Sequence, residues 1–113
     1  MENTIALVTG AAGGIGSAVV QTLAERGAVV AAVDRDAELL DQVVGKLTAE
    51  GLEVAACPAD VTDSDDVERT VEKVERLLGP VEHLVNAAGV LRLGEAVGLS
   101  DDDWNATFAV NAT

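Results

Sequence analysis

Short apolar runs alternate along the chain with longer segments in which apolar side chains recur at helical spacing. The apolar runs predict strands at residues 5–8, 28–33, 53–57 and 83–86. Strands separated by helices in this order are typical of βαβ units, whose strands pair in parallel. The pattern therefore predicts an α/β fold with a doubly wound parallel sheet.

Three helices are predicted between these strands, each with one apolar face. The residues on these faces are Ile15, Ala18, Val19, Thr22 and Leu23 in the first helix, Leu40, Val43, Val44 and Leu47 in the second, and Val67, Val71, Val74 and Leu78 in the third. The helices are expected to end near Gly27, Gly51 and Gly79, because glycine terminates helices. Thr62 and Ser64 are the predicted capping residues of the third helix.

The connections between the strands predict their order in the sheet. Right-handed crossovers place the strand at 83–86 beside the strand at 5–8, opposite the other two strands. Ligands bind where the strand order reverses in this way. The strand at 83–86 would form an unpaired apolar edge, which parallel sheets normally cover. We therefore expect residues 1–113 to be the N-terminal part of a longer fold.

A fourth helix is predicted to start at Ser100, where a capping serine is followed three residues later by an acid. Trp104, Phe108 and Asn111 lie on one stripe of this helix, at i, i+4 and i+7. Asn111 is therefore expected to face inward with the two aromatic residues.

A glycine-rich turn, Thr-Gly-Ala-Ala-Gly-Gly-Ile-Gly at residues 9–16, joins the first strand to the first helix. The first N–H groups of a helix lack internal partners and lie at its positive end, so such a turn can hold a pyrophosphate. Gly10 would allow the tight turn, Gly14 the approach of a ligand, and Gly16 close packing of helix on strand. From the turn alone, a connection that binds nothing stays open. A mononucleotide P-loop fits poorly, because it needs a lysine there and the first lysine is Lys46.

Charge and composition narrow the classes of partner. The net charge of −13 and the pI near 4.1 argue against nucleic acid, because phosphate binding needs clustered lysine and arginine. The acids of 36–50 and 62–75 are expected on solvated helix faces. The single cysteine, Cys57, cannot form an internal disulfide and is expected to be a small buried side chain. One histidine and no cysteine cluster leave no metal-ligand set. Without a membrane-length apolar run or a leader, the protein is expected in the cytoplasm.

Asp34 ends the second predicted strand, about twenty residues after the glycine turn. In a Rossmann-like fold an acid at this point accepts hydrogen bonds from the ribose hydroxyls of an adenosine. Its charge repels a 2′-phosphate, so the cofactor is predicted to be NAD and NADP is disfavoured. Arg35 could pair with such a phosphate, but the glycine run offers no second basic residue at Gly13.

The other strand ends supply further candidate contacts. Asp60 and Val61 follow the third strand, where they could contact an adenine; a helix-capping role for Asp60 is equally open. Small residues follow the fourth strand in the sequence Asn86-Ala87-Ala88-Gly89. They would let a cofactor approach the backbone, although an ordinary loop start fits the same residues.

Taken together, these spaced motifs resemble the short-chain dehydrogenase/reductase family over the whole chain. The matching residues are Thr9, Gly10, Gly14, Ile15 and Gly16 in the cofactor loop, Asp60 and Val61 at the adenine, Asn86, Ala87, Ala88 and Gly89 after strand four, and Asn111 in helix four. The resemblance implies one NAD(P)-binding domain, hydride transfer between a CH–OH carbon and nicotinamide, a small-molecule alcohol as substrate, and a homo-oligomeric full-length form. Asn111 would order water behind a catalytic lysine; a buried asparagine that bonds backbone also fits.

Residues 86–94, 99–104 and 108–111 resemble one subgroup, the 2,3-dihydro-2,3-dihydroxybenzoate dehydrogenases of catechol siderophore synthesis. This resemblance implies a carboxylated dihydrodiol as substrate. Arg92 follows the fourth strand and could pair with the substrate carboxylate. A solvated loop arginine is the alternative.

The family's reaction also needs a tyrosine that transfers the hydroxyl proton, with a lysine that raises its acidity and a serine beside the oxygen. The chain contains no tyrosine. His83 begins a buried strand and is no convincing substitute. The chain is therefore expected to be the inactive cofactor half of an oxidoreductase, or else a short dinucleotide-binding or interaction module. A doubly wound domain that binds no nucleotide is a third hypothesis.

Overall fold

The computed structural model describes residues 2–87 of the protein. The predictions for Ala88, Gly89, Arg92 and Asn111, and for the helix from Ser100, lie outside this range. Its elements are β1 (Ile5–Thr9), α1 (Gly14–Glu25), β2 (Val29–Asp34), α2 (Ala37–Ala49), β3 (Val54–Pro58), α3 (Ser64–Leu77) and β4 (His83–Asn86). The predicted strands thus have their expected places, with ends shifted by one residue at most.

The strands form one parallel sheet in the order β3-β2-β1-β4, as predicted from the handedness of the crossovers. At the centre of the sheet, Val8 of β1 pairs with Ala32 of β2 on one side and with Val85 of β4 on the other. The strand order reverses between β1 and β4. The carboxyl ends of the strands therefore meet at one edge, where a ligand site is expected.

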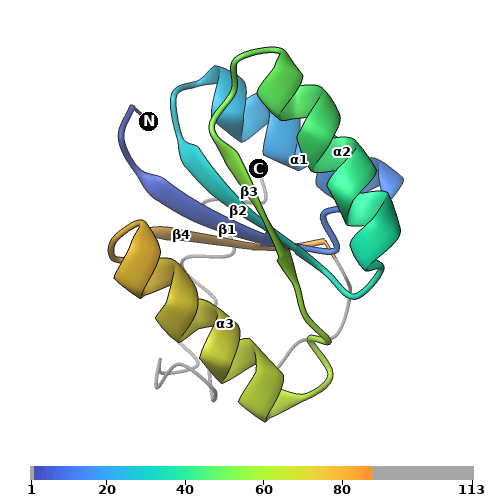
Figure 1. Cartoon of the computed structure of the whole chain (residues 1–113). Helices are drawn as coiled ribbons and strands as arrows, with labels where there is room; N and C mark the ends of the chain where they lie inside the picture. The colour runs from blue at the N-terminus through green and yellow to red at the C-terminus, as the bar shows by residue number, and fades with distance from the viewer. Residues whose placement is uncertain (1, 88–113) are drawn as a thin grey trace.

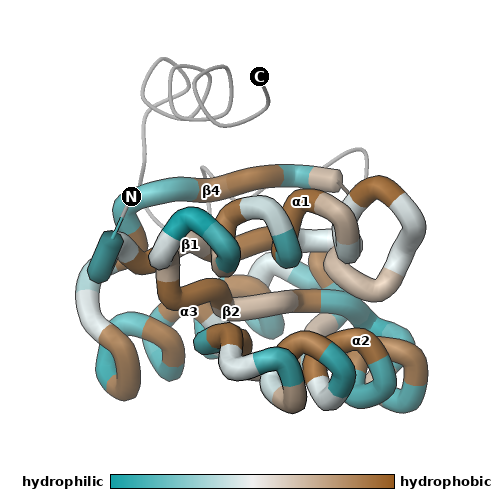
Figure 2. The backbone as a smooth tube through the Cα atoms, turned by 90° about the horizontal axis from the view of Figure 1, so that it is seen from above, coloured by the Kyte–Doolittle hydropathy of each residue, from teal (hydrophilic) through white to brown (hydrophobic). Residues whose placement is uncertain are grey.

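Helices cover both faces of the sheet, with α1 and α2 on one face and α3 on the other (Figure 1). Because side chains alternate along a strand, β1 contributes to both cores: Ala6 and Val8 pack with α1 and α2, while Ile5 and Leu7 pack with α3. Along α2, hydrophobic and hydrophilic residues alternate at the helical period (Figure 2). Burial on both faces explains why the strands are apolar runs.

The buried face of α1 agrees only in part with the predicted one: Leu23 is buried and Val19 packs against the core, but the other predicted residues do not. It consists of Gly16, Val20, Leu23 and Ala24, whereas Ile15, Ala18 and Thr22 are exposed. Ile15 in particular is 77% exposed. The prediction placed Ile15 on the buried face, but Gly16 packs against the Gly10 backbone and so orients its own side of the helix toward the sheet. The faces predicted for α2 and α3 are confirmed by their buried residues.

The start of α3 corrects a second prediction. Its N-cap is Asp63, and neither Thr62 nor Ser64 caps it. The Asp63 carboxylate accepts hydrogen bonds from the N–H groups of Asp65 at 3.0 Å and Asp66 at 3.3 Å. Asp63 has extended backbone angles, which turn its carboxylate back over the first turn, whereas Ser64 is already helical.

Cys57 is buried near the end of β3, as predicted, and burial raises the pKa of its thiol above the usual value. A weaker effect of the Lys73 charge lowers the same pKa. Among residues 2–87, no helix has the length and apolar character needed to cross a membrane. The same residues contain no group of three or more histidine, cysteine or acidic side chains arranged to hold a metal ion.

Candidate functional site

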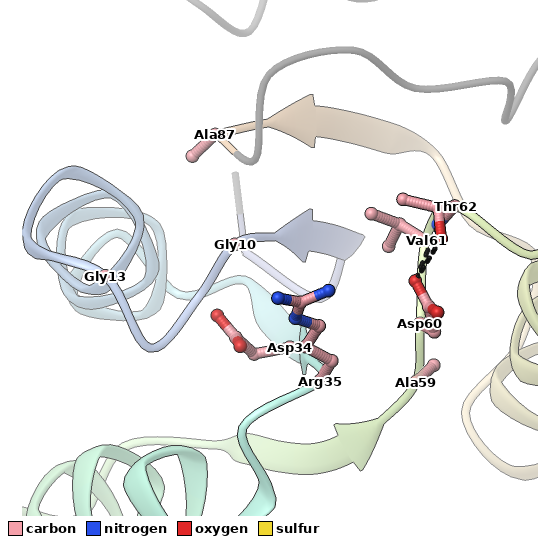
Figure 3. Close-up of a pocket in the computed structure, with 9 residues that line it drawn as sticks. All are labelled: Gly10, Gly13, Asp34, Arg35, Ala59, Asp60, Val61, Thr62 and Ala87. Carbon is pink, nitrogen blue, oxygen red and sulfur yellow. Dashed lines mark hydrogen bonds between the residues drawn. The ribbon is translucent and has the colours of Figure 1, made fainter.

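A cavity of about 300 Å³ lies at the carboxyl edge of the sheet (Figure 3). It is lined by Gly10, Gly13, Asp34, Arg35, Ala59, Asp60, Val61, Thr62 and Ala87. These residues lie at or just after the ends of β1, β2, β3 and β4 and come together because the strands are parallel. Six residues that the sequence named as candidate contacts are thereby brought into one cavity: Gly10, Asp34, Arg35, Asp60, Val61 and Ala87.

The glycine turn forms one wall of the cavity. Gly10 has a φ of 67°, a conformation that residues with a side chain rarely adopt, and its carbonyl accepts a hydrogen bond from the Gly13 N–H at 3.1 Å. A Cβ on Gly16 would overlap the Gly10 carbonyl oxygen, so Gly16 permits close packing of the helix on the turn itself. A Cβ on Gly14 would meet nothing within 4 Å, so the space beside Gly14 is open.

The N-terminus of α1 differs from those of the other helices. Its N-cap is Gly13, which provides no side-chain hydrogen bond, and its first turn carries no acid. In contrast, α2 and α3 are capped by the carboxylates of Asp36 and Asp63 and carry acids in their first turns. The first turn of α1 is therefore left without a capping carboxylate or an acid of its own, at the wall of a cavity. This combination suits an anionic ligand.

Asp34 is the last residue of β2, and both of its carboxylate oxygens accept hydrogen bonds from backbone. Oδ2 accepts from the Ala12 N–H at 3.0 Å, and Oδ1 accepts from the Asp36 N–H at 2.9 Å. An ionised carboxylate has about four lone-pair sites, so about two remain for a ligand. The sequence predicted Asp34 as a ligand contact but did not predict its bond to the glycine turn.

Asp60 lies across the cavity from Asp34 and is held by Thr62 (Figure 3). Its Oδ1 accepts hydrogen bonds from the Thr62 hydroxyl at 2.6 Å and the Thr62 N–H at 2.9 Å. These two bonds, more than the positive charge of Arg35, lower the pKa of Asp60 below its usual value. The helix-capping role left open for Asp60 is wrong, because Asp63 caps α3.

Thr9 and Asn86 join β1 to β4 behind the cavity. Thr9 is only 1% exposed, and its hydroxyl donates a hydrogen bond to Asn86 Oδ1 at 3.0 Å. The adjacent Ala87 N–H donates to the Thr9 carbonyl at 3.1 Å. Thr9 and Asn86 therefore do not line the cavity; they hold Ala87, which does. Ile15 lies outside the lining as well.

The sequence matches a family model along nearly its whole length. The model describes the short chain dehydrogenases, and it matches residues 4–113. The chain belongs to the short-chain dehydrogenase family.

Several known proteins are similar to this chain in sequence or in structure. The 2,3-dihydro-2,3-dihydroxybenzoate dehydrogenase of Bacillus subtilis (strain 168) is 52% identical over 113 residues, which are 100% of this chain and 43% of the relative. The crystal structure of gox2181 superposes with a TM-score of 0.77 at 32% identity, covering 95% of this chain and 42% of that chain. The crystal structure of 3-ketoacyl-(acyl-carrier-protein) reductase from Brucella melitensis, complexed with NADH, superposes with a TM-score of 0.69 at 34% identity. This match covers 74% of this chain and 33% of that chain. The chain thus spans less than half the length of these proteins.

Three lining residues of this short-chain dehydrogenase were not among the predicted contacts: Gly13, Ala59 and Thr62. Each lies next to, or within three residues of, a predicted contact in the sequence. Proximity to a predicted contact was therefore the one sequence feature that could have identified these lining residues. Their small or short side chains gave no chemical reason to select them.

Short-chain dehydrogenases use a nicotinamide dinucleotide, and the described residues fit such a group. The uncapped start of α1 and the open space at Gly14 suit its pyrophosphate, and the free lone pairs of Asp34 suit ribose hydroxyls. The cavity is at the lower end of the size range of small-molecule sites, as suits the adenosine end of a dinucleotide.

Proposed function

We propose that this chain forms the cofactor-binding part of an NAD-dependent short-chain dehydrogenase, which moves a hydride between a CH–OH carbon and nicotinamide. The observation that carries the proposal is the Asp34 carboxylate, which lies in the cavity beside the uncapped start of α1. NAD and NADP differ by a 2′-phosphate on the adenosine ribose. A carboxylate accepts hydrogen bonds from a ribose 2′-hydroxyl and repels a phosphate at the same place.

The charges around the cavity support NAD over NADP. Of the described residues that line it, Asp34 and Asp60 are acidic and Arg35 is the basic one. Arg35 also acts on Asp60, whose pKa its charge helps to lower. With two carboxylates and one guanidinium among these residues, a 2′-phosphate would enter a lining with excess negative charge.

Each predicted contact has a proposed role in this site. The turn residues Gly10, Gly14, Ile15 and Gly16 would surround the pyrophosphate, while Thr9 and Asn86 would hold the strand ends that support it. Asp60 and Val61 would contact the adenine, Asp60 accepting from its amino group. Ala88 and Gly89 would let the nicotinamide end approach the backbone, and Asn111 would order water behind the catalytic lysine.

The proposal is tested by fluorescence titration of the purified protein with NADH and with NADPH. Two like charges about 4 Å apart repel each other by about 1–4 kcal/mol near a protein surface. NADH is therefore expected to bind at least about tenfold more tightly, which corresponds to about 1.4 kcal/mol. Tighter binding of NADPH would contradict NAD as the cofactor. If neither NADH nor NADPH binds to protein that circular dichroism shows to be folded, the cofactor site itself is contradicted.

The proposed substrate is 2,3-dihydro-2,3-dihydroxybenzoate, within catechol siderophore synthesis in the cytoplasm. The support is the 52% identity over 113 residues to the Bacillus subtilis enzyme of that name. Arg92 is proposed to pair with the carboxylate of this dihydrodiol. Replacing Arg92 with alanine in the active enzyme should raise the KM for the diol and leave the KM for NAD unchanged.

The chemical step requires groups that these 113 residues do not include, since the sequence has no tyrosine. We therefore propose that a serine, a tyrosine and a lysine complete the site in a longer, homo-oligomeric product. The coding DNA past Thr113 tests this: an open frame with Tyr-x-x-x-Lys is expected. A stop codon in intact sequence would favour a non-catalytic dinucleotide-binding module.

A further inference from the structure

We infer that Asp34 also positions the glycine turn, so that one carboxylate both holds the turn in shape and contacts the ribose. This inference rests on the proposed NAD site and extends it. Its basis is the hydrogen bond from the Ala12 N–H to Asp34 Oδ2, at 3.0 Å. The two residues are separated by 22 positions in the sequence and come from different βα connections.

The geometry holds the Asp34 carboxylate from two sides. Oδ2 is bound by the Ala12 N–H of the β1–α1 turn, and Oδ1 by the Asp36 N–H at the start of α2. Hydrogen bonds to an ionised group are shorter and stronger than those between neutral groups. The carboxylate therefore cannot rotate without losing one of them, and it presents its remaining lone pairs in a constant direction.

The turn depends on this bond because it has few other attachments. The Ala11 N–H donates to the Val33 carbonyl at 3.0 Å, and the Gly13 N–H donates to Gly10 within the turn. Among residues 2–87, Asp34 is the side chain that accepts a hydrogen bond from a backbone N–H of the turn. No side chain caps α1, and Asp34 attaches the turn at Ala12, one residue before the N-cap Gly13.

Ligand binding need not break this arrangement. With about four lone-pair sites, the carboxylate can accept from two N–H groups and two ribose hydroxyls at once. An asparagine could not do so, because its NH₂ group would face one of the two backbone N–H donors. A substitution meant to change cofactor preference at this position would therefore also disturb the turn.

Amide hydrogen exchange tests the bond without any cofactor. In the unliganded wild-type protein the Ala12 amide is expected to exchange at least about tenfold more slowly than an unstructured amide. Asp34→Asn should accelerate it about tenfold or more. Asp41→Asn is the matched control, since it removes the same charge from an exposed position of α2 and should leave Ala12 unchanged. Exchange of the wild-type Ala12 amide at the unstructured rate would overturn the inference, whether or not Asp34→Asn folds.

Binding of ADP and of 2′,3′-dideoxy-ADP separates positioning from ribose contact. If Asp34 only contacts the ribose, Asp34→Asn should weaken the binding of ADP alone. Loss of a negative charge should then slightly strengthen the binding of the dideoxy ligand. If Asp34 also positions the turn, the dideoxy ligand should bind about threefold or more weakly. Unchanged or tighter binding of the dideoxy ligand to folded Asp34→Asn would overturn the inference but leave the NAD site standing. Failure of wild-type protein to bind either ligand would instead contradict the proposed function, and Ala12 exchange would still decide the positioning role.

Discussion

Gly16 of α1 packs directly against the carbonyl oxygen of Gly10, so closely that a Cβ atom on Gly16 would overlap this oxygen. The same carbonyl accepts the Gly13 N–H, so it is held in place and cannot move aside freely. This contact sets the distance between the start of α1 and the turn. The start of α1 is therefore positioned by the absence of a side chain at Gly16.

Gly16→Ala should destabilise the protein. The added methyl group would overlap backbone, which cannot yield as a flexible side chain can. Overpacking of this kind typically costs about 1–3 kcal/mol, and urea unfolding should show a loss in this range. Gly45→Ala is the control, because its Cβ would meet nothing within 4 Å in the interior of α2. That variant should gain roughly 0.5–1 kcal/mol; equal effects of both substitutions would contradict the packing argument.

Gly14→Ala should separate stability from binding. The added Cβ would lie in open space, so the free energy of unfolding should be kept or raised. If a pyrophosphate approaches this backbone, the methyl group should weaken NADH binding about fivefold or more, measured by titration calorimetry. Unchanged NADH affinity would remove Gly14 from the cofactor contacts.

Arg35→Ala should lower the affinity for NADPH more than that for NADH. Arg35 supplies the basic group among the described cavity residues, and it is the residue that could partly offset the charge of a 2′-phosphate. We expect the ratio of the two dissociation constants to move about threefold or more toward NADH. Lys46→Ala, which removes a positive charge from α2 outside the cavity, should leave the ratio unchanged.

Asp63→Ala should remove the cap of α3 and cost about 1 kcal/mol. The carboxylate accepts two N–H bonds of the first turn, which alanine cannot replace. Ser64→Ala, one residue on, should have little effect on chemical unfolding. A larger loss for Ser64→Ala than for Asp63→Ala would restore the sequence-based prediction that Ser64 caps the helix.

Thr62→Val should raise the pKa of Asp60 toward its usual value, because the Thr62 hydroxyl bond is the main cause of the lowering. The pKa should stay somewhat depressed, since the Thr62 N–H still donates. Because the folded-state pKa lies below the unfolded one, the Asp60 bonds stabilise the fold above the unfolded pKa. That contribution is lost as the pH falls through the folded-state value, below about 4. The pKa of Asp60 can be measured from the pH dependence of its carboxyl carbon chemical shift by NMR. An Asp60 pKa in Thr62→Val equal to that of the wild type would contradict the assigned cause.

Several parts of the fold and site could be predicted because they depend on local patterns. Alternating apolar runs identified β1 to β4, and the handedness of crossovers identified their order. Asp34 and Asp60 could be selected because acids at strand ends stand out chemically. Ala59 could not, because its small apolar side chain lines the cavity only through the way the strand ends meet.

The sequence by itself therefore determined the elements, the strand order, the family and the residue types at the carboxyl edge of the sheet. These follow from periodicity, turn residues and chain handedness, which act over a few neighbouring positions or a single crossover. Only the tertiary structure decided which face of α1 is buried and that Asp34 holds Ala12. Both depend on the approach of segments far apart in the chain, where the size of one glycine or the reach of one carboxylate decides the contact.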